Sequence, residues 1–157
     1  MKHLYLFLLL TLMGGSLLKA QRKYECKSKT FEELPLPGGT IDPGVFCKGT
    51  MVPARSKAVL QIQEAKVGKA SSCRVDLQVD NNALLMVKVV SPDKKTSKKL
   101  YKALKEQFGN PGRLDETNGL LIYTWRKQGE EGVPTTKTFR WKEEGSSVFT
   151  MERSGMN

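Results

Sequence analysis

The stretch that decides the fold is CRVDLQVDNNALLMVKVV, residues 73–90. Its first part places an apolar residue at every odd position from Cys73 to Val79, with polar residues between them. This alternation predicts a β-strand with one buried and one solvent-facing side. Three residues that tolerate a left-handed backbone follow at 80–82, and a nearly unbroken apolar run then covers 83–90. The stretch therefore predicts a hairpin whose second strand is central in a sheet.

The hydrophobic period changes directly after this hairpin. Residues 91–93, Ser-Pro-Asp, offer a hydrogen-bonding cap, a proline suited to the first helical position and an acid that complements the positive helix end. Leu100, Leu104 and Phe108 then recur at helical spacing until a glycine ends the pattern. We expect a helix over 92–108 that packs through these three side chains.

The remaining strands are expected on both sides of this unit. Alternation predicts one strand near 57–66 and three more at 120–125, 137–142 and 148–153. The last three form an antiparallel meander, because their connections are too short for a parallel crossover. The predicted fold class is therefore α+β: a mostly antiparallel sheet of about six strands, in the order βββ-α-βββ, with one helix on one face.

The N-terminal residues 1–20 have the pattern of a secretory signal peptide, with a basic head, an apolar run and Ala20 before the expected cleavage point. The run is short for a membrane span, and a retained anchor is the alternative. We expect a secreted or periplasmic product. The predicted organisation is a signal peptide at 1–20, a Pro/Gly-rich arm at 21–56 pinned by a disulfide, and an α+β domain at 57–157.

Three cysteines follow the predicted signal: Cys26, Cys47 and Cys73. An oxidising compartment permits one disulfide and leaves one thiol over. Cys26 and Cys47 are the favoured pair, because both lie in a turn-rich segment that a crosslink worth about 3 kcal/mol would stabilise. Cys73 is expected to point inward as a small apolar residue.

Enzymatic chemistry is restricted by composition. His3 is the only histidine and lies in the predicted signal, which removes Ser-His-Asp and Cys-His catalysis and disfavours a zinc site. A carboxylate pair such as Glu64 with Asp76, or the Cys73 thiol, is the remaining route to an enzyme. Solvated surface acids and a buried thiol are the simpler interpretation, so we expect no catalytic residue and no cofactor.

A formal net charge of +10 favours acidic partners. The candidate ligand-binding residues are basic ones on the predicted helix and later strands: Lys94, Lys95, Lys98, Lys99, Lys102, Lys105, Arg126, Arg140 and Lys142. Lysine on the helix favours diffuse attraction over bidentate recognition. The expected partners are an acidic polysaccharide, an anionic membrane surface or an acidic protein, whereas nucleic acid is not expected because it is scarce outside the cytosol. A merely solvated helix face is the alternative.

Aromatic residues interleave with these cations at Tyr123, Trp125, Phe139 and Trp141. Such an arrangement could stack on bases or sugars. Aromatic side chains at alternating strand positions also form the core of a sheet, and a lone helix needs such a face to pack against. Sheet core is the favoured interpretation.

The function expected from these patterns is that of a small, non-enzymatic, envelope-associated binding protein. The alternative is a protein-interaction or inhibitor module that uses the loop 34–44. The segment from Leu104 to Trp125, in which a helix ends in Phe-Gly-Asn-Pro before a strand, resembles small exported bacterial envelope proteins such as outer-membrane assembly lipoproteins. That resemblance implies a helix packed on an antiparallel sheet. The chain departs from it in having no cysteine directly after the apolar run, and no residue role is carried over.

Overall fold

The computed structural model describes residues 21–27, 29–47, 57–126, 135–142 and 145–153, so the predicted signal peptide at 1–20 lies outside the described part. Two helices and nine strands are found within these ranges. In chain order they are β1 (Arg22–Cys26), β2 (Thr30–Phe31), α1 (Pro43–Phe46), β3 (Ala58–Val67), β4 (Ala70–Asp80), β5 (Ala83–Ser91), α2 (Lys94–Phe108), β6 (Arg113–Thr117), β7 (Leu120–Arg126), β8 (Thr135–Lys142) and β9 (Ser147–Arg153).

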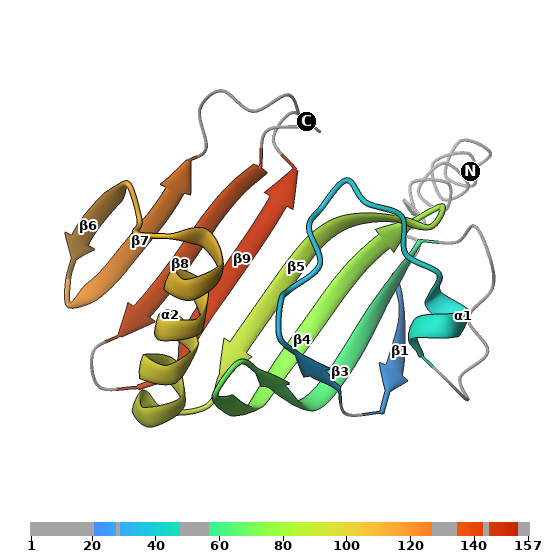
Figure 1. Ribbon diagram of the computed structural model, residues 1–157, viewed down its shortest axis with the longest axis horizontal. Coiled ribbons are helices and arrows are strands. Elements are labelled where there is room, and N and C mark those ends of the chain that lie inside the picture. Colours follow the sequence, from blue (N-terminus) through green and yellow to red (C-terminus); the bar gives the residue numbers. More distant parts are fainter. Residues whose placement is uncertain (1–20, 28, 48–56, 127–134, 143–144, 154–157) are drawn as a thin grey trace, which may run out of the picture.

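All of these strands join one sheet, in the order β1-β3-β4-β5-β9-β8-β7-β6, with β2 also paired to β3 (Figure 1). The strands β3 to β5 form one antiparallel meander and β6 to β9 form a second. The two meanders meet where β5 pairs antiparallel with β9. Because β1 and β2 run parallel to β3, the sheet is mixed.

The predicted fold class is wrong in its strand count, its element order and its single helix. The sheet has nine strands instead of about six, and the helix α1 was not expected. The strands missing from the prediction are β1, β2 and β6, which have five, two and five residues. They are short and lie at the margins of the sheet, and each buries at most one side chain, so no apolar alternation records them.

The strand β6 nevertheless left a turn signal in the sequence. Asn118 and Gly119 have φ angles of +51° and +71° and join β6 to β7 in a two-residue turn. Asn-Gly is the strongest short-range indication of a hairpin, because both central residues of such a turn need positive φ. The side chain of Leu114 in β6 is 55% exposed, which explains why hydrophobic periodicity did not reveal the strand.

The helix α2 begins two residues later than predicted. Asp93 is its N-cap, and its carboxylate accepts hydrogen bonds from the backbone N–H and the hydroxyl of Thr96, both at 2.9 Å. The predicted packing is confirmed for Leu100 and Leu104, which are fully buried. Phe108 is half-buried and its ring stacks on that of Phe149, with centroids 5.9 Å apart.

Ser91 is buried in the structure and does not cap the helix. Its hydroxyl lies 2.5 Å from that of Ser97 on α2 and 2.7 Å from that of Ser147 on β9. This cluster ties the start of the helix to two central strands. Hydrogen bonding within it compensates for the burial of three hydroxyl groups.

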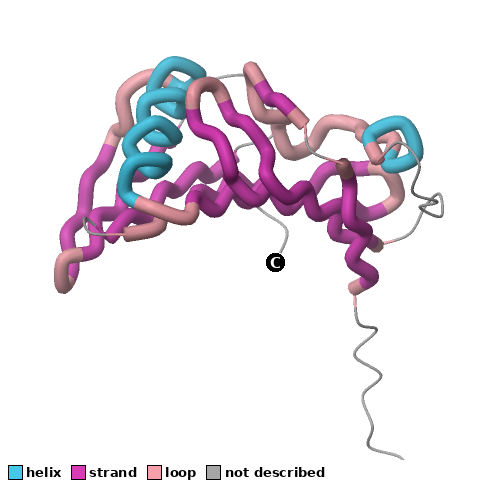
Figure 2. Tube along the Cα trace, turned by 90° about the horizontal axis from the view of Figure 1, so that it is seen from below, coloured by secondary structure: helices cyan, strands magenta, loops and turns pink. Residues whose placement is uncertain are grey.

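One face of the sheet carries both helices and the N-terminal loop, as Figure 2 shows. The core lies between the sheet and these covering elements. It is lined by alternate residues of the central strands, such as Leu60, Leu77 and Val89, each fully buried. We refer to this side as the covered face. No helix in the described ranges combines the length and apolar character that a membrane span needs.

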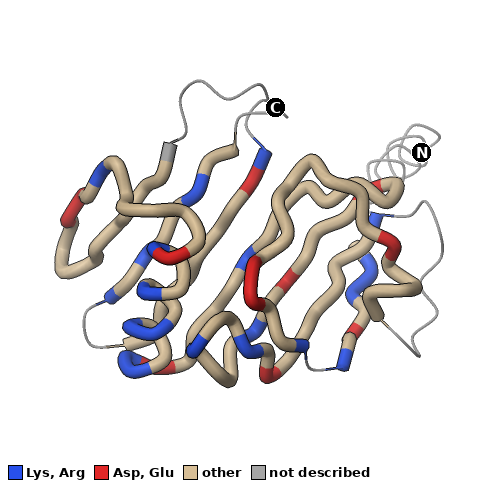
Figure 3. The backbone as a smooth tube through the Cα atoms, viewed as in Figure 1, with Lys and Arg blue, Asp and Glu red and all other residues tan. Residues whose placement is uncertain are grey.

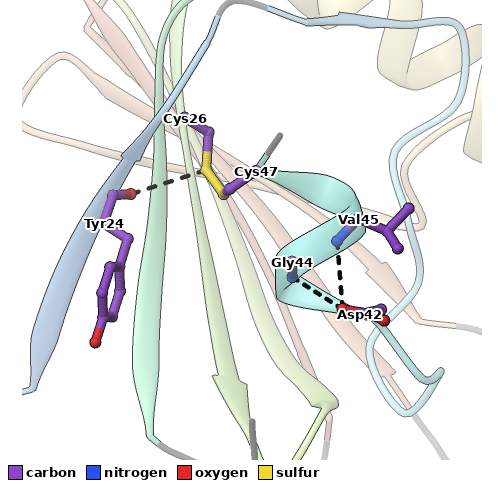
Figure 4. Close-up of a disulfide and its surroundings, with 6 residues drawn as sticks. All are labelled: Tyr24, Cys26, Asp42, Gly44, Val45 and Cys47. Carbon is purple, nitrogen blue, oxygen red and sulfur yellow. Dashed lines mark hydrogen bonds between the residues drawn. A yellow bond between two sulfur atoms is a disulfide. The ribbon is translucent and has the colours of Figure 1, made fainter. Parts of the chain in front are cut away.

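The predicted disulfide between Cys26 and Cys47 is confirmed (Figure 4). It joins the end of β1 to the residue after α1, with Cα atoms 4.8 Å apart. Asp42 caps α1 by accepting hydrogen bonds from the backbone N–H groups of Gly44 and Val45. The crosslink and this cap hold a Pro/Gly-rich segment in one conformation.

Candidate functional site on the lysine face of α2

The helix α2 presents lysines on the side opposite its packed residues. Successive helical residues are rotated by about 100° around the axis, so positions that do not share the direction of Leu100 and Leu104 project sideways or outward. The exposed lysines that define the lysine face are Lys94, Lys95, Lys98, Lys99, Lys102 and Lys105. Figure 3 shows these cations gathered along one helix.

Few acidic side chains in the described part of the chain pair with the lysine face. Within the described ranges, its one ion pair joins Lys102 Nζ to Glu106 Oε1 at 4.0 Å, and both side chains are more than 60% exposed. Such pairs contribute little to stability. Like charges also stand four residues apart at Lys94/Lys98, Lys95/Lys99 and Lys98/Lys102, each pair costing about 0.2–0.5 kcal/mol.

The helix dipole adds to this cost at the start of α2. Lys94 and Lys95 lie in the first turn, where unpaired N–H groups carry partial positive charge and where no residue after the N-cap Asp93 is acidic. A sequence selected only for a soluble, stable helix would place acids there. The negative charge next to these two lysines in the described ranges is that of the N-cap Asp93, which interacts with Lys95.

The structure brings together the six helix lysines but not the basic residues predicted to join them from β8. Arg140 and Lys142 are exposed on the opposite side of the sheet from α2. Side chains alternate along the strand, and Phe139 points to the covered face, where its ring lies 5.5 Å from that of Tyr101 on α2. Arg126 belongs to β7, but its side chain is outside the described part of the structure.

Lys137 is a basic residue whose burial was not predicted. It has the same strand parity as Phe139, is 7% exposed, and places Nζ 5.2 Å from the centroid of the Phe108 ring. The period of two residues along β8 was a signal that could have placed it on the covered face. Its cation supports packing of the helix end and is separate from the lysine face.

Tyr101 borders the lysine face and was not among the predicted site residues. Its half-buried ring lies 4.6 Å from that of Tyr123 on β7, centroid to centroid, and Lys105 Nζ lies 5.8 Å from its centroid. Burial, and then the neighbouring Tyr123, raise the pKa of Tyr101 above its usual range. An open depression of about 430 Å³ is lined by Tyr101, Lys102, Lys105 and Glu106. Ring and cations thus share one small surface.

Three of the four aromatic residues that the sequence places among the cations belong to the core. Trp125 is 4% exposed, Phe139 is fully buried and Trp141 is 8% exposed. The indole N–H of Trp125 donates a hydrogen bond to the carbonyl oxygen of Gly109 at 2.9 Å, which links β7 to the end of α2. All three rings are buried, so the favoured interpretation of their alternation as sheet core is confirmed for them.

The groups considered for an enzyme are not arranged as the sequence suggested. Strand pairing places Gln61, not Glu64, opposite Asp76, and the Gln61 amide donates to that carboxylate at 2.9 Å. Glu64 lies at an irregularity of β3 with a φ of +53° and is exposed. Cys73 is fully buried, and burial, aided by the charge of Asp93, raises its pKa to about 11. Its thiol is therefore neutral at physiological pH. No cluster of potential metal-binding side chains occurs in the described ranges.

The loop 34–44 is packed against the sheet. Leu34 is 2% exposed, and its backbone N–H and carbonyl both bond to the side-chain amide of Gln107, each at 3.1 Å. The N–H of Gly38 donates to the carbonyl oxygen of Leu84 on β5 at 2.8 Å. Much of this loop is thus a structural cover, although Leu36 remains 57% exposed.

No protein-family model matches the chain, and no curated protein or solved structure matches it. The features that bear on function are therefore those of the molecule itself. Among them, the lysine face and the adjoining Tyr101 ring combine exposed positive charge with an aromatic ring held by contacts to the sheet.

Proposed function

We propose that this protein is a non-catalytic binding module that attaches to acidic surfaces outside the cytosol through the lysine face of α2. The observation that carries the proposal is the set of six exposed lysines on a helix of 15 residues, which form a single long ion pair within the described residues. The disulfide between Cys26 and Cys47 suits the oxidising compartment in which such a module would act.

Lysine is suited to this form of attachment. Its ammonium group is a compact charge on a long stem, so several lysines can follow an irregular acidic surface without a fixed bonding geometry. Because the ammonium groups are solvent-exposed, added salt screens their attraction over about 10 Å at 0.1 M. Binding should therefore be fast, moderate in strength and strongly dependent on salt.

The test compares retention on immobilised heparin and on anionic vesicles as sodium chloride is raised. The helix variant replaces four lysines by glutamine: Lys94, Lys98, Lys102 and Lys105. The control variant makes the same replacement at four exposed lysines outside α2: Lys23, Lys27, Lys66 and Lys69. Both variants lose the same net charge. We expect the helix variant to elute at clearly lower salt than the control.

Circular dichroism of both variants checks that α2 remains folded, and replacing the lysines should if anything strengthen the helix by removing repulsion. Equal losses in the two variants would show that net charge alone acts, and retention that ignores salt would exclude the proposed attachment. Either result would remove the lysine face as the functional site.

A further inference from the structure

Tyr101 is held as a rigid platform at the edge of the lysine face. Its ring contacts those of Tyr123 and Phe139, with centroid separations of 4.6 and 5.5 Å, and the Trp125 ring is 6.4 Å away. Aromatic contacts from β7 and β8 therefore fix its orientation before any ligand arrives. A ring held in this way loses little conformational freedom on binding.

The apolar surface continues from this ring towards the sheet edge. Tyr123 is half-buried, and Leu114 on β6 is its register partner on the same face of the sheet, with 55% of the leucine exposed. Lys102 and Lys105 line the open depression together with Tyr101, and Lys105 Nζ lies 5.8 Å from the centroid of the Tyr101 ring. One short path along the surface thus passes from apolar contacts to cations.

We infer that the acidic partner is a polysaccharide bearing carboxylate or sulfate groups, and that Tyr101 stacks against a sugar ring while Lys102 and Lys105 bind its anionic substituents. This inference rests on the proposed function and deepens it. The apolar C–H face of a sugar ring packs on an aromatic ring, and the charged substituents at the edge of the sugar then reach the neighbouring ammonium groups. A site that binds such a polysaccharide needs both cations that complement its charge and an immobilised aromatic ring.

A membrane surface fits this arrangement less well. Tyr101 is half-buried beside lysines whose long side chains extend from the same helix, so a flat bilayer would meet the ammonium groups before the ring. A single polysaccharide chain is narrow enough to contact both. An acidic polypeptide would use the lysines equally but would not need a stacking platform.

Glu106 sets the polarity of the site. Its carboxylate lines the same depression and lies 4.0 Å from Lys102 Nζ, so it repels anions from that end. Lys105, which has no ion pair in the described ranges, is the stronger anion contact and lies beside Tyr101. The anionic substituent is therefore expected near Lys105, close to the stacked ring.

The experiment measures affinity at low salt by calorimetry for three probes: size-fractionated heparin oligosaccharides, poly-L-glutamate of similar total charge, and vesicles containing phosphatidylglycerol. The variants are Tyr101→Leu, which removes the ring, Tyr101→Phe, which keeps it, and Tyr24→Leu, which removes a half-buried tyrosine of β1. We expect Tyr101→Leu to weaken heparin binding roughly 3- to 10-fold and to leave poly-L-glutamate binding unchanged. Tyr101→Phe should bind heparin clearly more tightly than Tyr101→Leu, and Tyr24→Leu should retain the wild-type affinity for heparin.

Two results would overturn the inference and leave the proposed function intact. One is equal wild-type affinity for heparin and poly-L-glutamate, and the other is a folded Tyr101→Leu variant with unchanged heparin affinity. Preference of the wild type for the vesicles would assign the site to a membrane surface and also overturn it. Binding to none of the three probes would remove the proposed function itself. The comparison of probes on the wild type remains decisive if Tyr101→Leu does not fold.

Discussion

Replacing Gly68 with alanine should disturb the contact between the β3–β4 hairpin and α2. Gly68 has a φ of +54°, and a Cβ at this position would lie 2.9 Å from the Cβ of Ala103 on α2. The left-handed backbone costs a residue other than glycine about 1–2 kcal/mol. The contact is far shorter than an ordinary carbon separation, and relieving it should cost roughly 1–3 kcal/mol more. We expect the free energy of unfolding to fall by about 2–5 kcal/mol in total.

Urea unfolding followed by tryptophan fluorescence measures this change, because Trp125 and Trp141 are 4% and 8% exposed and will report loss of packing. The matched control is Gly119→Ala. Gly119 also has positive φ, at +71°, but a Cβ there would meet nothing within 4 Å. The control should therefore lose only the backbone contribution. Equal losses of unfolding free energy in the two variants would refute close packing between the hairpin and the helix.

The double variant Gly68→Ala with Ala103→Gly separates the two contributions further. Ala103→Gly alone should cost about 1 kcal/mol as a glycine within a helix. Combined with Gly68→Ala, it removes the obstructing Cβ, so the two changes together should cost less than the sum of the single changes. Strict additivity would show that the alanine at 68 does not press on α2.

Two further predictions concern titrating groups. Because burial raises the pKa of Cys73 from 9.0 to about 11, the unfolded chain loses this proton first, and stability should fall as pH rises from about 9 towards 11. Urea unfolding of Cys73→Ala over this range should show a shallower decline than the wild type, and parallel curves would contradict the assignment. Hydrogen bonds from the backbone and then the hydroxyl of Thr96 hold the pKa of Asp93 below 3.8, so this cap stabilises the fold above that pH and its contribution is lost as pH falls through the lower, folded value. Asp93→Asn should show a weaker loss of melting temperature on acidification, and an unchanged acid dependence would exclude Asp93 as a contributor.

The strands that bury one face were predictable from the sequence because burial imposes a period of two residues. Alternation from Cys73 to Val79 lies within β4, and each of the four apolar residues is at most 1% exposed. The same rule could not find β6, whose leucine is exposed. It also could not find β1, which was expected only as part of an arm and gains its partner β3 through pairing across the chain. Local patterns record side-chain burial, whereas edge pairing depends on the assembled sheet.

The lysine face was predictable for a different reason. Six lysines fall outside the apolar stripe of α2, and helical geometry alone places them in solvent. The prediction that Arg140 joins the lysine face is wrong. Its neighbour Phe139 faces α2, and alternation along the strand then points Arg140 to the opposite side of the sheet. Tyr101 could not be assigned from the sequence, since its orientation depends on contact with Tyr123, which lies in a different element.

The two flanks of α2 differ in their contacts with the rest of the described structure. One flank is fixed to the rest of the molecule at Ala103, which faces Gly68 across a contact too close for another side chain, and at Gln107, which bonds to the backbone of Leu34. The other flank, from Tyr101 outward to the lysines, has no element of the described structure covering it. Anchoring on one side therefore allows the opposite side to retain repelling charges that would destabilise an isolated helix.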